Sequence, residues 1–147
     1  MAAIRRAEAT WSGPLTTGSG EVSGISSGTF SGLPVSWGSR TENADGRTSP
    51  EELLAAAHAS CFSMAFATRL AKAGVADPNI TVTAKVTFGP KPEGGNAVLS
   101  SALNVRAQAP DGDAAKLKAV AEDAKENCPI SKALKGNVAL SVEATPS

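Results

Sequence analysis

The most informative hydrophobic pattern lies mid-chain, where residues 49–73 carry apolar side chains on nearly every face of a helix. At about 100° per residue, such an all-round apolar pattern is typical of a helix buried in a core. Ser49 predicts the N-cap, Pro50 suits the first helical position, and Gly74 predicts the stop. We therefore predict a long central helix over residues 49–73.

The chain before this helix has the pattern of a small strand meander. Residues 1–47 are rich in Gly, Ser and Thr, with short apolar pieces between turn signals. Val35 and Trp37 alternate with small or polar neighbours, as in a half-buried strand. The polar stretch 39–47 predicts a loop that leads into the helix. We place the strands at residues 6–12, 20–30 and 33–40.

The chain after the helix alternates strictly over residues 81–88, which predicts a strand with one wet face. Asp113 is suited to cap a second helix, which Pro129 interrupts. The remaining predicted elements are a hairpin loop at 89–96, a return strand at 98–108, a short helical turn at 130–134 and a strand at 138–142. Strands, long helix, hairpin, helix and strand in this order predict an α+β fold with antiparallel sheets.

Length and composition narrow the class of protein. At 147 residues we expect one domain spanning 1–147, made of N-terminal strands 1–47, central helix 49–73, and a hairpin, helix and strand over 78–144. Fourteen basic and fourteen acidic residues give a net charge of zero, which argues against a nucleic-acid or anionic-membrane binder. We expect no membrane span and no secretory signal, and therefore a cytoplasmic protein.

The two cysteines are the candidate reactive groups. Cys61 lies near the middle of the central helix, so it is either an inert core residue or a thiolate stabilised by a cation from the preceding loop, Arg40 or Arg47. Cys128 precedes Pro129 and a possible helix, where a helix N-terminus would stabilise a thiolate. Local chemistry alone favours Cys128, although it equally fits a residue that merely ends a helix.

Three functions stay open from the residues alone. One is a dithiol/disulfide redox enzyme. A second is a metal site formed by Cys61, Cys128, His58 and a carboxylate, which lacks a close-spaced ligand signature. A third is a cysteine hydrolase that uses Cys61 and His58, the only histidine, although no oxyanion arrangement is visible. We expect His58 to be a partly buried helix residue with a satisfied hydrogen bond.

A family resemblance covers essentially the whole chain. Residues 48–64, TSPEELLAAAHASCFSM, resemble the central motif of the family of osmotically inducible protein C (OsmC) and the organic hydroperoxide resistance proteins. Residues 124–134, AKENCPISKAL, resemble the second cysteine motif of that family. The start of the chain agrees at residues 9–13 and 39–42. The resemblance implies an OsmC-like α+β fold that forms an intertwined homodimer with sites at the subunit interface.

The resemblance also implies a thiol-dependent peroxidase that reduces organic hydroperoxides in defence against oxidative or osmotic stress. Cys61 would be the peroxidatic thiol and Cys128 the resolving thiol, with Arg40 and Glu51 as a salt-bridged pair beside Cys61. Residues 18–20, where the organic hydroperoxide resistance branch has its arginine, are Gly-Ser-Gly, so we assign the OsmC branch. The reductant would be a lipoyl or thioredoxin-type dithiol, with no cofactor and no metal. The alternative is a non-enzymatic redox sensor or stress-binding protein that uses the same cysteines.

Overall fold

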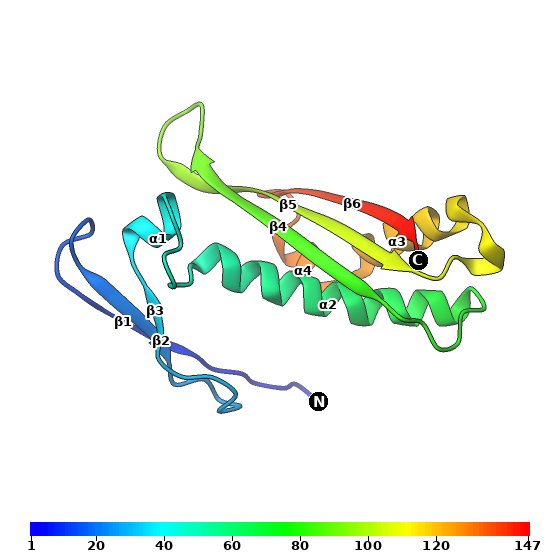
Figure 1. Ribbon diagram of the computed structural model, residues 1–147, viewed down its shortest axis with the longest axis horizontal. Helices are drawn as coiled ribbons and strands as arrows, with labels where there is room; N and C mark the ends of the chain where they lie inside the picture. Colours follow the sequence, from blue (N-terminus) through cyan, green and yellow to red (C-terminus); the bar gives the residue numbers. More distant parts are fainter. The chain divides into compact units, whose positions relative to one another are not determined.

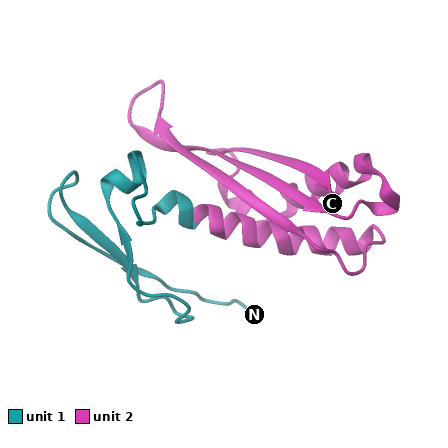
Figure 2. Cartoon of the chain, in the orientation of Figure 1, with its two compact units in different colours: residues 1–53 teal, residues 54–147 magenta.

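The computed structural model describes residues 1–147 and divides the chain into two compact units, residues 1–53 and residues 54–147 (Figure 2). The first unit contains β1 (Glu8–Ser12), β2 (Ser19–Ser23), β3 (Leu33–Val35), α1 (Trp37–Thr41) and the first turn of α2 (Pro50–Lys72). The second unit contains the rest of α2 and then β4 (Thr81–Pro90), β5 (Asn96–Ala107), the 3₁₀ turn η1 (Pro110–Gly112), α3 (Ala114–Asn127), α4 (Pro129–Leu134) and β6 (Ala139–Pro146) (Figure 1).

The first unit is an antiparallel sheet in the order β1-β2-β3. Directly opposed residues share a face, and one face is apolar, with rows Ala9–Val22–Leu33 and Trp11–Gly20–Val35. A Cβ at Gly20 would lie 2.8 Å from the Trp11 ring, so glycine lets the indole lie across the sheet. The buried hydrophobic residues of the chain all belong to the second unit, and Trp11 keeps 44% of its surface exposed. This apolar face therefore has little cover within its own unit.

Residues 33–40 do not form one strand, which corrects our prediction. The strand ends at Val35, and Trp37–Thr41 form the helix α1. Ser36 caps it: its hydroxyl accepts from the Ser39 backbone N–H at 3.0 Å, and the Ser39 hydroxyl accepts from the Ser36 N–H at 3.0 Å. This reciprocal capping box has serine at the third helical position, where glutamate or glutamine is the usual signal. The alternation of Val35 and Trp37 was therefore misread as a continuing strand.

The second predicted strand also ends early, at Ser23 instead of residue 30. Gly24 adopts a φ of 57°, in the left-handed region that favours glycine, and this turns the chain out of the sheet. The first strand, Glu8–Ser12, lies within the predicted range 6–12.

The second unit contains a mixed sheet in the order β4-β5-β6. β4 and β5 form the predicted antiparallel hairpin, with an irregularity between Thr87 and Phe88. β6 pairs parallel with β5, which corrects our expectation of antiparallel sheets. The segment that holds α3 and α4 separates β5 from β6, and such a crossover is what a parallel pair requires.

The long helix α2 begins and ends close to the prediction. The Ser49 hydroxyl accepts a hydrogen bond from the Glu52 backbone N–H at 3.1 Å, which is an N-cap contact. Gly74 has a φ of 98°, and the Val75 N–H bonds the Leu70 carbonyl at 2.9 Å, which closes the C-terminus.

Within the chain α2 buries one stripe, although its composition predicted burial all round. The buried residues are Glu51, His58, Phe62, Phe66 and Leu70. On another face, Met64 keeps 67% of its surface exposed. By length and composition alone α2 is also apolar enough to cross a membrane, contrary to our expectation that no segment would be. That criterion is weak, because core helices of soluble proteins meet it too.

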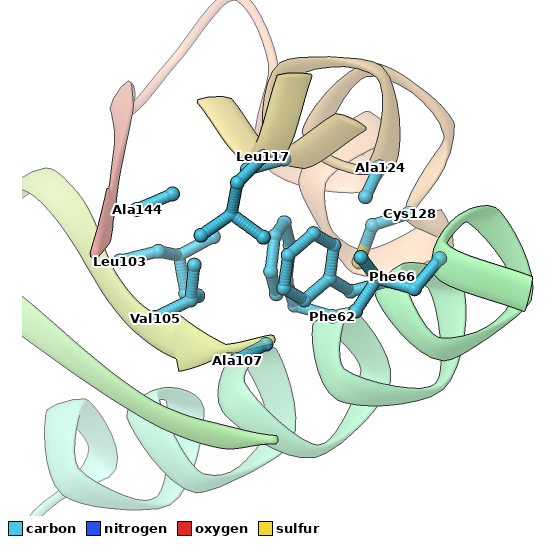
Figure 3. Packing of buried hydrophobic residues seen from close by; sticks show 11 residues of the cluster. Phe62, Phe66, Leu103, Val105, Ala107, Leu117, Ala124, Cys128 and Ala144 are labelled. Carbon is cyan, nitrogen blue, oxygen red and sulfur yellow. The ribbon is translucent and has the colours of Figure 1, made fainter. Parts of the chain in front are cut away.

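The hydrophobic core lies between the sheet β4-β5-β6 and the helices. Phe62 and Phe66 of α2 stack with ring centroids 5.5 Å apart, beside Leu117 of α3 and Leu103 of β5 (Figure 3). Asp113 caps α3 as predicted, accepting from the backbone N–H of Ala115 at 2.8 Å. Cys128 belongs to this core, which places the second thiol inside the unit.

Candidate active site

The two thiols lie next to each other. Cys61 comes from the middle of α2, and Cys128 joins α3 to α4. The Cys128 thiol donates to the Cys61 sulfur at 3.3 Å, and both cysteines are free. Cys128 is fully buried, whereas Cys61 is partly exposed. A disulfide needs sulfurs about 2.05 Å apart, so the bond would form after an approach of little more than about 1 Å.

Pro129 explains why the chain breaks at Cys128, between α3 and α4. A residue before proline is disfavoured in the helical region, and Cys128 adopts φ −67° and ψ 123°. It therefore ends α3 as its C-cap and begins α4 as its N-cap, with Pro129 in the first turn of α4. The break predicted from the Cys-Pro pair is confirmed, and α4 occupies Pro129–Leu134.

The N-terminus of α4 donates a backbone hydrogen bond to Cys61, whereas the local sequence predicted that a helix N-terminus would stabilise Cys128. Burial raises the pKa of the Cys61 thiol, while a hydrogen bond from the Ile130 backbone N–H to the sulfur lowers this pKa. Ile130 lies in the first turn of α4, where backbone N–H groups have no partner within the helix. The adjacent Cys128 also raises the pKa of Cys61, first through the hydrogen bond between the two sulfurs and then through their electrostatic interaction. A nearby cation would favour the Cys61 thiolate.

His58 lies fully buried one helical turn before Cys61. Its Nδ1 is 2.7 Å from the Ser101 hydroxyl of β5, and its Nε2 is 2.8 Å from the Ser131 hydroxyl of α4. Burial lowers the pKa of His58 below 6.5, which keeps the ring neutral. A neutral imidazole has one donor and one acceptor nitrogen, and a serine hydroxyl complements either.

The contacts of His58 weigh against its use as a catalytic base or as a metal ligand. A cysteine hydrolase needs an imidazole nitrogen directed at the nucleophilic sulfur, but serines occupy both nitrogens of His58. The structure contains no group of three or more His, Cys, Asp or Glu side chains arranged to hold a metal ion. The close thiol pair instead favours redox chemistry.

Arg40 and Glu51 form an ion pair in the first unit. Arg40 belongs to α1 and Glu51 to the first turn of α2. The guanidinium Nε donates to the two carboxylate oxygens at 3.0 and 3.2 Å, and Nη2 donates to Oε1 at 2.8 Å. Arg47, the other arginine considered, lies 3.6 Å from Asp45 in an exposed pair. Of the two arginines considered, Arg40 is thus the one that Glu51 holds, and it lies in α1 instead of the predicted loop.

Sequence reasoning missed three groups around the thiols. The backbone N–H of Ile130 bonds Cys61, and the hydroxyls of Ser101 and Ser131 bond His58. A signal for Ile130 was present, since the residue after a proline in the first turn of a helix has a free N–H. No local signal pointed to the serines, which lie 43 and 73 residues from His58.

Comparison with protein families places these residues in a known context. The family model described as OsmC-like protein matches residues 42–143, which include both cysteines and Glu51. Peroxiredoxin OsmC of Escherichia coli strain K12 is 36% identical over 140 residues, which are 95% of this chain and 96% of that protein. An organic hydroperoxide resistance protein-like 1 of Staphylococcus epidermidis is 36% identical over 66% of this chain and 69% of its own length.

Solved structures give the same result. The organic hydroperoxide resistance protein OhrB of Bacillus subtilis has a TM-score of 0.73 and 26% identity, covering 95% of this chain and 98% of that chain. An organic hydroperoxide resistance protein from Elizabethkingia anophelis has a TM-score of 0.76 and 25% identity, and the match covers 100% of both chains. The predicted α+β, OsmC-like fold is confirmed.

Proposed function

The chain belongs to the OsmC family, and from this premise we propose that it is a thiol-dependent peroxidase that reduces organic hydroperoxides to alcohols. The observation that carries the proposal is the pair of free thiols 3.3 Å apart, one partly exposed and one buried. The relatives support the substrate class, since they are named peroxiredoxin and organic hydroperoxide resistance protein.

In the first step the Cys61 thiolate attacks the distal oxygen of the hydroperoxide. The O–O bond breaks, the sulfur becomes a sulfenic acid, and the alkoxide takes a proton to leave as the alcohol. The sulfur loses two electrons and the peroxide gains them. Cys61 suits this role because its sulfur is partly accessible and accepts the Ile130 N–H, which stabilises negative charge.

In the second step the Cys128 thiol attacks the Cys61 sulfenic sulfur. A sulfur–sulfur bond forms and the hydroxyl leaves as water, which protects Cys61 from further oxidation. An external dithiol, of lipoyl or thioredoxin type, then exchanges with the disulfide and returns two electrons and two protons. The balance is one hydroperoxide and one dithiol consumed per alcohol, water and oxidised dithiol formed.

We assign the activating charge to Arg40. Burial raises the pKa of Cys61, so the thiolate needs a cation, and a guanidinium also stabilises the negative charge that develops on the leaving oxygen. The contacts of Glu51 with Nε and Nη2 fix the plane of the Arg40 guanidinium. The exposed Arg47, paired with Asp45, has no part in this role.

We also infer that the two units act as one OsmC-like domain and that the protein is a homodimer. The three-stranded sheet of the first unit presents an apolar face, including Trp11, and the unit has no buried hydrophobic residue. A sheet of this size needs its apolar face covered to be stable. Met64 on α2 adds a second exposed apolar side chain. A second copy of the chain covers these surfaces, and light scattering after gel filtration is expected to give twice the monomer mass.

The test is turnover of cumene hydroperoxide with dithiothreitol or a lipoyl system as the reductant. Wild-type protein is expected to consume hydroperoxide and reductant in equal amounts over many cycles. Cys61→Ser is expected to abolish turnover, and Cys128→Ser to allow one oxidation and then stall. If the wild type is oxidised once at Cys61 and no turnover follows with either reductant, the protein is a redox sensor and the peroxidase proposal is wrong.

A further inference from the structure

Two side-chain contacts join α2 to the segment formed by Cys128 and α4. The sulfurs of Cys61 and Cys128 are 3.3 Å apart, and His58 Nε2 is 2.8 Å from the Ser131 hydroxyl. His58 precedes Cys61 by three residues on one segment, and Ser131 follows Cys128 by three on the other. The segments therefore run antiparallel at this point, with the two contacts one helical turn apart. The contact between His58 and Ser131 therefore sets the position along α2 at which Cys128 faces Cys61.

The helix α4 is short, and few of its side chains pack against the core. The helix has six residues, far fewer than an isolated helix needs for stability. Between Ser131 and β6 lies a pocket of about 190 Å³, lined in part by Lys132 and Leu140. Ser131 is nevertheless 2% exposed, because its hydroxyl is directed at the buried His58. A polar bond thus ties this short helix to α2 beside the pocket.

We propose that His58 is a positioning residue for the resolving step: through Ser131 it holds α4 so that Cys128 faces the Cys61 sulfur. The inference rests on the proposed peroxidase function, since it concerns how fast the disulfide forms. The other ring nitrogen of His58, Nδ1, bonds Ser101 of β5, so the imidazole links α4 to the sheet. Both hydrogen bonds of His58 go to serine hydroxyls, so it acts on the sulfurs through α4.

The chemistry of resolution makes this position matter. Cys128 must attack the Cys61 sulfur along the line of the departing hydroxyl, and a displacement of about 1 Å from such a geometry can cost about a hundredfold in rate. The sulfenic acid is meanwhile open to a second hydroperoxide, which yields sulfinic acid. A shift of α4 therefore diverts Cys61 from disulfide to over-oxidation. The first oxidation of Cys61 needs no contribution from Cys128, so a shift of α4 affects it only through the Ile130 N–H contact with the Cys61 sulfur.

A matched pair of variants tests the inference. Ser131→Ala and Ser101→Ala each remove one hydroxyl from the same buried imidazole, but only Ser131 lies on the helix that follows Cys128. Each protein receives one equivalent of cumene hydroperoxide and is quenched over time. Mass spectrometry then follows the sulfenic acid, the Cys61–Cys128 disulfide and the sulfinic acid, and urea unfolding gives the stability of each variant.

We expect Ser131→Ala to form the disulfide about tenfold more slowly, equal to the loss of about 1.4 kcal/mol in the transition state. Its first oxidation should slow much less than its disulfide formation, and its sulfinic product should rise at excess peroxide. Ser101→Ala should lose similar stability but resolve within about twofold of the wild type. Equal slowing in both variants, or none in Ser131→Ala, overturns the positioning role while leaving the peroxidase proposal intact.

A second comparison uses His58 itself. His58→Gln keeps one donor and one acceptor, whereas His58→Ala keeps neither. The glutamine variant is expected to form the disulfide several-fold faster than the alanine variant, and equal rates contradict the inference. A wild-type protein that forms no disulfide at all overturns the proposed function and, with it, this inference.

Discussion

Replacing Glu51 by glutamine is the sharpest perturbation of the proposed activating pair. The Glu51 side chain is 8% exposed and accepts three contacts of 2.8–3.2 Å from the Arg40 guanidinium. Glutamine keeps the shape and one acceptor oxygen, but it removes the charge. Its amide also turns an N–H group toward the N–H groups of Arg40, which can only donate.

The magnitude follows from the geometry. Two unit charges about 4 Å apart interact by about 4 kcal/mol at an effective dielectric constant of about 20. Desolvation of Glu51 offsets much of this, and Arg40 remains 31% exposed and therefore screened. We expect Glu51→Gln to lower the free energy of unfolding by about 1–2 kcal/mol. Because the guanidinium plane is then free to move, the rate constant for Cys61 oxidation should fall by about thirtyfold to a hundredfold.

Stopped-flow loss of free thiol with limiting cumene hydroperoxide measures the rate constant, and urea unfolding measures the stability. Arg47→Gln is the matched control, because Arg47 lies 3.6 Å from Asp45 in a pair with 44% and 86% exposed side chains. This variant should change the free energy of unfolding by less than about 0.5 kcal/mol and leave the rate unchanged. A Glu51→Gln protein that is destabilised but oxidises at the wild-type rate refutes the activating role of Arg40, as does slowing by Arg47→Gln.

Three further predictions concern the fold around the site. Phe66→Ala should cost about 3–5 kcal/mol in urea unfolding, because the ring is fully buried in the core; a cost below about 1 kcal/mol contradicts this packing. Asp113→Ala should cost about 1 kcal/mol, since the carboxylate accepts from the backbone N–H groups at the start of α3; unchanged stability shows that the cap contributes nothing. Burial lowers the pKa of His58, so below pH 6.5 the unfolded chain binds a proton that the native state resists. The unfolding free energy should therefore fall as the pH drops below 6.5, and it should fall less in His58→Gln; NMR titration of this only histidine to a pKa above 6.5 contradicts the sign.

Elements with strong local signals could be predicted from the sequence. Ser49 and Gly74 mark the ends of α2, and Asp113 marks the start of α3, because caps act within a few residues of the group they bond. The strict alternation at residues 81–88 corresponds to β4, because the burial of alternate side chains is set within the strand itself.

Features that depend on distant contacts could not be predicted in this way. The parallel pairing of β6 with β5 is set by the path of the chain through α3 and α4, not by any pattern within β6. α1 was missed because Ser36 and Ser39 cap each other, a weaker signal than alternation across Val35. The pairing of β6 and the change from β3 to α1 both depend on contacts beyond the pattern of a single strand.

In the candidate site too, residues could be identified from the sequence, whereas contacts between distant segments could not. Cys61 and Cys128 were candidates from the residues alone, whereas the family resemblance chose Arg40 over Arg47, added Glu51 and assigned the roles. The contacts of the thiol pair and of the ion pair are present, while the catalytic roles remain proposals. The bonds of His58 to Ser101 and Ser131 join segments that nothing in the sequence links. The Ile130 N–H was overlooked although Pro129 marks the start of a helix, because which group accepts from it depends on the packing of α4 against α2.

The most direct test of the central claim is mass spectrometry of the wild-type protein after one equivalent of cumene hydroperoxide. The sample is alkylated, digested without reductant, and searched for the peptides that contain Cys61 and Cys128. The proposed peroxidase predicts these two peptides joined by a disulfide in nearly all molecules, with one cumyl alcohol released per protein chain. A Cys61 that stops at the sulfenic or sulfinic acid beside an alkylated Cys128 contradicts the account.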